Sequence, residues 1–306
     1  MAPVSAFSRG ILKVTLAAAL WGAAYPLTKG ALAHVPPIGL GALRFLIAAL
    51  VLMAMTRSRP LQGIEPTDRP TVIKLAFWGT FVLILGMNYG LQWAPAVAAS
   101  IISGTPPLFT VILAALWLGE PFHRRHAVAM GLALTGLFQL TSEAGGATSD
   151  GKAWIGCLLV LLPQFAWAMY GVIGKSLIER VSWPHLCRDT FALGALMLAP
   201  FAIAEGLLQG WGTWNSSAIA TLLYLGIANS VITYGLWNSA LADIPVSTAS
   251  FVLYVQPVSG AVLSWWLFGE SLGLSGAIGA LLIFSALAMV LRPSPALQPT
   301  NPSTEV

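Results

Sequence analysis

The chain has 306 residues, of which 57% are hydrophobic and only 8% are charged. This composition excludes an ordinary soluble globular protein of this length and is typical of a polytopic helical membrane protein. The formal net charge of +4 does not indicate nucleic-acid binding, because basic residues beside membrane spans report topology and contact with anionic lipid.

Ten segments are apolar and long enough to cross a bilayer, which requires roughly 17 to 25 residues of helix. In chain order they are residues 11–33, 38–55, 71–91, 95–117, 125–142, 153–174, 186–205, 216–238, 245–267 and 273–292. The connections between them are short and leave no room for a separate soluble domain. The tail at 293–306 is rich in Pro, Ser and Thr and is predicted to be disordered.

Basic residues are distributed unevenly between the two sides of these segments. With the N-terminus inside, twelve of the 15 Lys and Arg residues fall on the cytoplasmic side. The opposite side holds only Lys29 and Lys152, and Arg44 lies within a span. By the positive-inside rule, this bias predicts a multi-pass protein of the cell inner (plasma) membrane with both termini in the cytoplasm.

Markers in the first half of the chain recur in the second half. Trp21 and Lys29 recur as Trp167 and Lys175, with the same spacing of eight residues. In and after the fourth and ninth segments, five residues recur with an offset of 150: Pro95, Ser100, Pro107, Gly119 and Glu120 correspond to Pro245, Ser250, Pro257, Gly269 and Glu270. The second copy begins five spans after the first. Because an odd number of crossings takes the chain to the other side of the bilayer, the second copy is inverted relative to the first. The sequence therefore predicts two inverted five-helix repeats, over residues 11–142 and 152–292, an arrangement typical of secondary transporters.

These markers resemble the EamA-like family of the drug/metabolite transporter (DMT) superfamily. The similar features are Trp-Gly at Trp21, Lys29, the stretch Ala-Leu-Arg-Phe around Arg44, and Pro107 with Gly119-Glu120. The resemblance extends over both halves and implies a carrier whose spans one to four and six to nine line a central cavity. Spans five and ten are then scaffold or dimer contacts. It favours export of amino acids or related metabolites by alternating access, with uptake or exchange as the alternative.

Prolines within the fourth and ninth segments predict interrupted helices near the middle of the membrane. A proline lacks the N–H donor and frees the carbonyl four residues earlier, so Pro107 frees that of Ser103 and Pro257 that of Leu253. Interrupted helices at corresponding positions in two repeats point to a transporter's binding site. A packing kink satisfied by neighbouring groups is the alternative. Both prolines are assigned a gating or structural role.

The candidate substrate-binding residues are polar or aromatic side chains within the spans. An unpaired polar group there is costly unless it faces a cavity or another polar group. The candidates are Trp21, Tyr25, Asn88, Ser100, Ser103, Thr105, Gln164, Trp167, Tyr170, Tyr234, Asn238, Ser250, Tyr254 and Gln256. Asn229 and Thr233 add polar groups at similar depth. Rings could stack an organic solute and amides could bind a zwitterion, but helix packing and interhelical hydrogen bonds explain the same residues.

Charged residues within and at the ends of spans are candidate gating or structural groups. Arg44, inside the second span, is predicted to act structurally or in gating rather than in binding a substrate carboxylate. Lys29 with Glu270 on the external face, and Lys175 with Glu120 on the cytoplasmic face, would make two alternating gates. Independent interface charges worth little each are the alternative.

Motifs of other functional classes are missing from the sequence. There is no GxxxxGK[ST] or HExxH motif, and Cys157 and Cys187 cannot form a metal quartet. The predicted partners are a small-molecule substrate and the bilayer, with no cofactor, metal or nucleic acid, and a homodimer is left open. A membrane-embedded enzyme is a distant alternative, because no nucleophile, base or metal set is visible.

Overall fold

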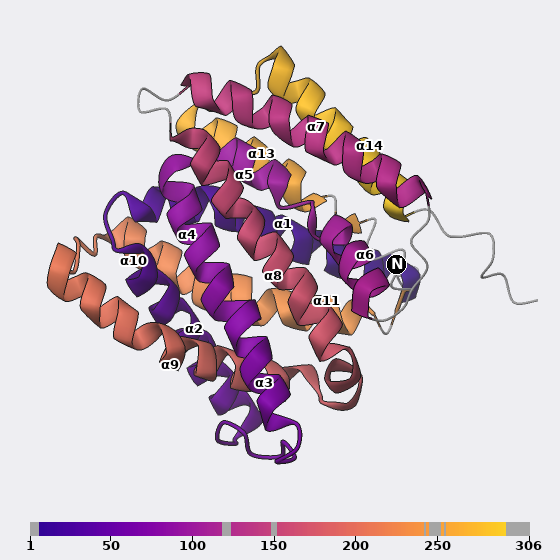
Figure 1. Cartoon of the computed structure of the whole chain (residues 1–306). Helices are drawn as coiled ribbons and strands as arrows, with labels where there is room; N and C mark the ends of the chain where they lie inside the picture. Colours follow the sequence, from indigo (N-terminus) through magenta and orange to yellow (C-terminus); the bar gives the residue numbers. More distant parts are fainter. Residues whose placement is uncertain are drawn as a thin grey trace, which may run out of the picture.

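The computed structural model describes residues 6–117, 124–147, 152–241, 243–244, 252–253 and 255–291. Every regular element in these ranges is a helix (Figure 1). The labels η1 and η2 denote π-helical segments, and the elements in chain order are α1 (Ala6–Leu32), α2 (Pro37–Thr56), α3 (Arg69–Ala76), η1 (Phe77–Val82), α4 (Leu83–Trp93), α5 (Ala96–Ile102), α6 (Pro106–Trp117), α7 (Arg124–Ala147), α8 (Ala153–Arg180), α9 (Trp183–Gln209), α10 (Ser216–Leu223), η2 (Tyr224–Ile232), α11 (Thr233–Ala240), α13 (Val255–Phe268) and α14 (Leu274–Leu291).

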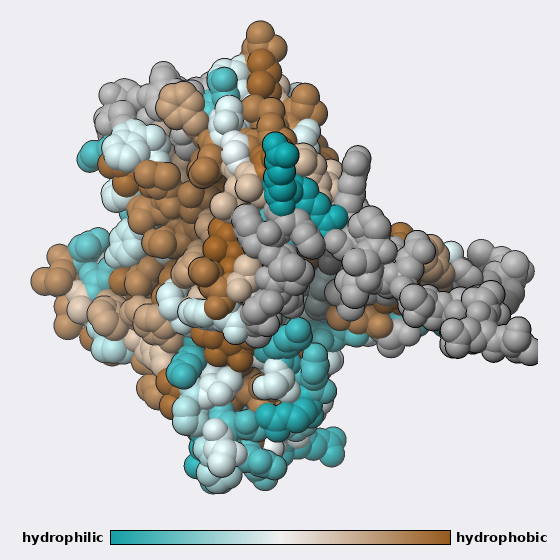
Figure 2. Space-filling view, turned by 45° about the vertical axis from the view of Figure 1, so that its right-hand side comes forward, coloured by the Kyte–Doolittle hydropathy of each residue, from teal (hydrophilic) through white to brown (hydrophobic). Residues whose placement is uncertain are grey.

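Seven helical runs in the described residues are long and apolar enough to cross a membrane. They are Ala6–Leu32, Pro37–Thr56, Arg69–Trp93, Ala96–Trp117, Ala153–Arg180, Trp183–Gln209 and Ser216–Ala240. These runs coincide with predicted spans one to four and six to eight. Apolar side chains cover much of the outer surface, while hydrophilic residues gather toward the lower end of the view in Figure 2. The chain is therefore a multi-pass membrane protein.

The other three predicted spans are not among these seven runs. Helices α7 and α14 cover spans five and ten and pack against each other at one edge of the bundle (Figure 1). Their backbones approach closely, because a Cβ added at Gly136 would lie 2.6 Å from the carbonyl oxygen of Gly279. Helix α13 covers the second part of span nine, whose residues 245–251 and 254 lie outside the described ranges. The count of ten spans thus stays a prediction.

The predicted interruption of span four is confirmed. Helix α5 ends at Ile102 and α6 begins at Pro106, with a turn between them. The backbone N–H and the hydroxyl of Thr105 both donate to the carbonyl of Ile102, at 3.0 and 2.8 Å. The Ser103 hydroxyl donates to the carbonyl of Ser100 at 2.6 Å. Local hydroxyl groups therefore satisfy carbonyls that the break releases, as a break within a membrane requires.

Two π-helical segments occupy similar places in the two halves of the chain. Helices α3 and α10 each have eight residues, begin at positions 69 and 216, and continue directly into η1 and η2. Each π segment carries a glycine at a close contact. A Cβ at Gly79 would lie 2.5 Å from the ring of Tyr170, and one at Gly226 would lie 2.8 Å from Ile47. Such segments are frequent at functional sites, and both of these border the centre of the bundle.

Helix α1 packs without clearance against α13 at one glycine. A Cβ on Gly22 would lie 2.1 Å from the carbonyl oxygen of Gln256 and 2.1 Å from the hydroxyl of Ser259. Because one obstacle is backbone, a side chain at this position must move an entire helix. This contact fixes the distance between the first span and the second half of the chain.

Gly22→Val is therefore expected to destabilise the protein by about 1–3 kcal/mol or more through overpacking. Gly131→Val is the matched control, because a Cβ on Gly131 of α7 meets no atom within 4 Å. The free energy of unfolding in mixed detergent micelles, measured for both variants, checks this prediction. Equal stability of the two variants would contradict the close α1–α13 contact.

Candidate functional site

A cavity of about 500 Å³ lies at the centre of the bundle. Its walls are formed by α1, α2, η1, α4 and α6 from the first half and by α8, η2, α11 and α13 from the second half. The turn that interrupts span four borders it through Ser103 and Gly104. Its volume falls in the range typical of small-molecule sites. The cavity therefore lies between the two halves of the chain and is large enough for a small organic molecule.

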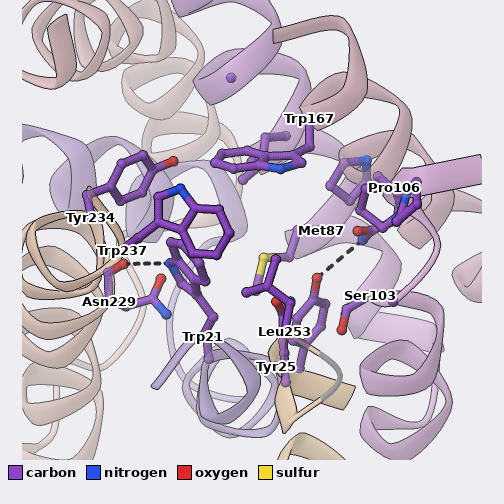
Figure 3. Close-up of a pocket in the computed structure, with 18 of the residues that line it drawn as sticks. Trp21, Tyr25, Met87, Ser103, Pro106, Trp167, Asn229, Tyr234, Trp237 and Leu253 are labelled. Atoms are coloured by element: carbon purple, nitrogen blue, oxygen red, sulfur yellow. Dashed lines mark hydrogen bonds between the residues drawn. The ribbon is translucent and has the colours of Figure 1, made fainter. Parts of the chain in front are cut away.

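Four aromatic rings form one side of the cavity, and we call them the aromatic wall: Trp21, Trp167, Tyr234 and Trp237 (Figure 3). The ring centroid of Trp21 lies 6.3 Å from that of Trp167, 5.7 Å from that of Tyr234 and 6.1 Å from that of Trp237. These rings come from α1, α8 and α11. Their faces and edges suit an apolar or cationic part of a solute.

Polar groups lie on the opposite side, near the break in span four. Gln164 Nε2 donates to the hydroxyl of Tyr25 at 3.2 Å and to the carbonyl of Val160 at 3.1 Å. Ser103 lines the cavity beside them, and Figure 3 shows it next to Tyr25. Gln256 of α13 also borders the cavity. Amide and hydroxyl groups from both halves thus face the same space.

Arg44 is buried in the bundle and borders the cavity. Its Nη2 donates to Asn229 Oδ1 at 2.6 Å and its Nε donates to Ser230 Oγ at 3.1 Å. Asn229 in turn donates to the carbonyl of Leu20 at 3.1 Å, and its own carbonyl accepts from Trp21 Nε1 at 3.2 Å. The guanidinium is therefore directed into the protein, toward η2, and not outward to the lipid headgroups.

The cavity includes half of the predicted substrate-binding residues. Those that line it are Trp21, Tyr25, Ser103, Gln164, Trp167, Tyr234 and Gln256. Those that the structure places away from its walls are Asn88, Ser100, Thr105, Tyr170 and Asn238. The remaining two, Ser250 and Tyr254, lie outside the described residues. Pro107 borders the cavity at the start of α6, whereas Pro257 is buried in α13.

The five predicted residues that do not line the cavity make contacts within the protein, and their assignment to substrate binding stays a prediction. Tyr170 stacks on Trp167 with an interplanar angle of 6°. The other four donate hydrogen bonds to backbone carbonyls: Asn88 to Pro37 at 2.7 Å, Ser100 to Ala96 at 2.8 Å, Thr105 to Ile102 at 2.8 Å and Asn238 to Tyr234 at 2.8 Å. The bond from Asn88 joins α4 to α2, as the alternative of hydrogen bonds between helices expects. The other three bonds reach back only three or four residues along the chain.

Two ion pairs tie helix α1 to the second half of the chain, one near each end of the helix. Lys29 Nζ lies 3.1 Å from Glu270 Oε1 and donates to the carbonyl of Ala94 at 2.6 Å. Glu270 also accepts the backbone N–H of Val97 at 2.9 Å, at the start of α5. The structure thus joins the one predicted charge pair whose members are both described.

The second predicted pair stays a prediction, because Glu120 lies outside the described residues. Its predicted partner Lys175 is exposed on α8. At that end of the bundle a different pair is present, with Lys13 Nζ 2.7 Å from Asp243 Oδ2. The hydrogen bond from Lys13 lowers the pKa of Asp243. Sequence reasoning missed this pair because Asp243 stands in a short connection with no partner at helical spacing.

Several lining residues carry no signal in the sequence. The apolar lining residues cannot be distinguished in the sequence from core or lipid-facing side chains. They are Ala24, Phe45, Leu83, Met87, Val111 and Leu253. Trp237 follows Tyr234 by three residues, so both occupy one helix face, and this spacing could have identified it. Among the described residues, α9 contributes nothing to the cavity walls, although the family resemblance implied that span seven would line it.

Comparison with known proteins identifies both halves of the chain. The sequence profile of the EamA-like transporter family matches residues 8–142 and 154–292. An "Uncharacterized transporter" of Archaeoglobus fulgidus is 28% identical over 281 residues, covering 92% of this chain and 96% of the relative. A "Probable amino-acid metabolite efflux pump" of Escherichia coli is 24% identical over 287 residues, covering 91% and 93%.

One further relative and one solved structure extend the comparison. A "Probable terminal-alkyne amino-acid exporter" of Streptantibioticus cattleyicolor is 24% identical over 263 residues, covering 86% of each chain. A solved crystal structure has the same fold, with a TM-score of 0.61 at 23% identity, covering 92% of this chain and 96% of that one.

Proposed function

Because this chain belongs to the EamA-like transporter family, we propose that it is a secondary transporter that exports amino acids or related metabolites by alternating access. The observation that carries the proposal is the central cavity of about 500 Å³, whose walls come from both halves of the chain. The names of the Escherichia coli and Streptantibioticus cattleyicolor relatives, which refer to amino-acid metabolites and an amino acid, support this solute class.

The proposed architecture is ten transmembrane helices in two inverted repeats, with both termini in the cytoplasm of an inner-membrane protein. Three observations support it. The family profile matches twice, once in each half. The two π segments follow eight-residue helices that begin 147 positions apart, at Arg69 and Ser216. The basic residues are concentrated on one side of the predicted spans.

In the proposed cycle, the aromatic wall and the facing amides hold the solute while the two halves rock around it. Such a motion moves the opening of a central site from one membrane face to the other. The broken fourth span and the π segments η1 and η2 are the places where helices near the cavity depart from regular geometry. Irregular backbone of this kind is tolerated within a membrane where it borders a cavity.

The Lys29–Glu270 ion pair is proposed to close the external side of the cavity. Lys29→Glu and Glu270→Lys place like charges together, and each is expected to lower the solute exchange rate roughly 5- to 30-fold, the effect of 1–2 kcal/mol on a two-state equilibrium. The combined exchange of charges is expected to recover part of the rate. Recovery is partial because the ammonium group introduced by Glu270→Lys cannot accept a hydrogen bond from the backbone N–H of Val97.

Exchange of labelled solute in proteoliposomes, measured for the two single variants and the combined variant, checks this prediction. Losses that simply add in the combined variant would show that the two charges act independently, as exposed surface pairs often do.

Export itself is tested in cells that produce the chain and in matched cells that lack it. Cells with the chain are expected to release at least one amino acid or related metabolite faster into the medium. Lower extracellular and higher intracellular levels in the producing cells would instead indicate uptake and overturn export.

A further inference from the structure

Arg44 is a buried cation with no described acidic partner. Its two hydrogen-bond acceptors, Asn229 Oδ1 at 2.6 Å and Ser230 Oγ at 3.1 Å, are both uncharged. None of the described residues that line the cavity is Asp or Glu. A guanidinium away from water is costly unless an anion pairs with it. Among the described residues, the site therefore holds one positive charge and no negative charge to balance it.

The buried acids described in the membrane-spanning runs are committed elsewhere. Glu205 accepts the backbone N–H groups of Ile38 and Gly39 at 2.9 and 3.1 Å, at the start of α2. Asp189 pairs with Arg188, whose Nε lies 2.7 Å away. Neither carboxylate is a hydrogen-bond partner of Arg44, so the missing negative charge does not come from them.

The Arg44 guanidinium also keeps unused hydrogen-bond donors. Its Nε and Nη2 each make one hydrogen bond, and Nη1 makes none to any residue in the described ranges. A guanidinium presents five N–H groups in a planar fork that matches a carboxylate. Because Arg44 borders the cavity, these remaining donors lie where a solute carboxylate can reach them.

The aromatic wall lies directly beside this charge. Trp21 Nε1 donates to the carbonyl of Asn229 at 3.2 Å, and the Asn229 side chain holds Arg44. A solute whose anionic group meets Arg44 thus has its remaining atoms against Trp21 and the neighbouring rings of Tyr234 and Trp237. This arrangement matches a molecule with a charged end and an apolar end.

We infer that Arg44 binds the carboxylate of the transported solute, and that the site takes monocarboxylates, free or zwitterionic, with an aromatic or aliphatic body. This inference rests on the proposed function and specifies the solute class of the same cavity. It replaces the sequence-based expectation that Arg44 acts only in structure or gating. The uncharged hydrogen bonds to η2 hold the guanidinium in place, and the solute supplies its counter-ion.

The test compares three probes of similar shape on the purified full-length protein in detergent: 3-phenylpropionate, 3-phenylpropanamide and 3-phenylpropylamine. Isothermal titration measures each dissociation constant. The carboxylate is expected to bind at least about tenfold more tightly than the neutral amide, as a hydrogen-bonded charge pair in a desolvated site would give. The amine is expected to bind most weakly. Equal binding of carboxylate and amide, or no binding of the carboxylate, would overturn the inference.

Variants assign the preference to Arg44. Arg44→Gln is expected to lower the affinity for the carboxylate to that for the amide while leaving the amide affinity unchanged. Arg44→Lys keeps the charge and is expected to retain part of the preference. Lys152→Gln, which removes an exposed cation before α8, is the control and should bind all three probes like the parent. An intact carboxylate preference in folded Arg44→Gln would overturn the inference.

The comparison of probes on the unmodified protein remains decisive even where Arg44→Gln does not fold. Flux measurements separate this inference from the proposed function. Transport of neutral or cationic solutes without preference for carboxylates would refute the role of Arg44 and leave the carrier intact. Absence of flux for every solute would refute the carrier itself.

Discussion

Asp189→Asn is expected to destabilise the protein by about 3–5 kcal/mol, the cost of leaving a buried charge without its partner. Arg188 and Asp189 are both fully buried at the start of α9. Arg188 donates from Nε and Nη2 to the two Asp189 oxygens at 2.7 and 3.0 Å. Its guanidinium also donates to the hydroxyl of Ser58 and to the carbonyl of Gln62. The substitution strands this charge without changing side-chain shape.

The same pair holds the connection between α2 and α3. Asp189 Oδ1 accepts the backbone N–H of Leu61 at 2.9 Å. Arg57 and Leu61 in this connection have positive φ angles of 50° and 60°, a conformation unfavourable for residues other than glycine. The contacts to α9 therefore keep the connection in a shape that it would not adopt alone.

A double-mutant cycle isolates the pair. Arg188→Met alone strands Asp189, whereas Arg188→Met combined with Asp189→Asn removes both charges and retains an acceptor for Leu61. The combined variant is expected to be more stable than either single variant. The exposed pair of Arg180 with Asp68, 3.0 Å apart, provides the control, since Asp68→Asn should cost only about 0–1 kcal/mol. Unfolding in mixed micelles supplies the free energies, and equal costs for Asp189→Asn and Asp68→Asn would refute this account.

Val111→Trp is expected to abolish solute exchange while leaving the protein folded. Val111 of α6 is only partly buried and lines the cavity, so an indole ring at this position occupies space that the solute requires. Leu116→Trp, on the same helix at a position that is 72% exposed, adds the same ring to the outer surface. It is expected to exchange solute at the parent rate.

Exchange by the two variants, reconstituted at equal protein density, checks this prediction after size-exclusion chromatography confirms that both are folded. Parent-like exchange by Val111→Trp would show that the solute does not pass through this cavity.

The main features of the fold could be predicted from the sequence because they depend on the length and the hydrophobicity of each segment. A run of apolar residues must form a helix in lipid, since every backbone group has to be satisfied within the segment. The described helices accordingly match seven predicted spans. Pro106 and Pro107 predict the break in span four, because a residue without an N–H cannot continue the helical hydrogen-bond pattern.

The candidate site was harder to predict, because identical residue types serve two purposes in a membrane. Ser100 and Thr105 resemble cavity residues in the sequence, yet each donates to a nearby carbonyl. Arg188 is one of the twelve basic residues that the sequence assigns to the cytoplasmic side. In the structure it is fully buried, against a connection about 130 residues earlier in the chain. The periodicity of the sequence carries no information on such distant contacts. Polar residues within the spans could therefore be identified from the sequence, but not which of them line the cavity.

The paired markers were the most informative part of the sequence for the site. Trp21 and Trp167, which the predicted repeat pairs with each other, have their ring centroids 6.3 Å apart in the aromatic wall. Lys29 and Glu270, assigned to one face by the predicted topology, form an ion pair. Both results follow from placing spans of two halves around one centre, which requires only their order and direction.

Counterflow in proteoliposomes tests the central claim, that the chain is a carrier of small organic solutes, most directly. Vesicles containing the purified protein are loaded with unlabelled amino acids and related metabolites, singly, and diluted into trace labelled solute. A carrier is expected to accumulate the label transiently above its external concentration, driven only by the outward movement of unlabelled solute, and protein-free vesicles should not. No such accumulation for any solute of the panel would contradict the account.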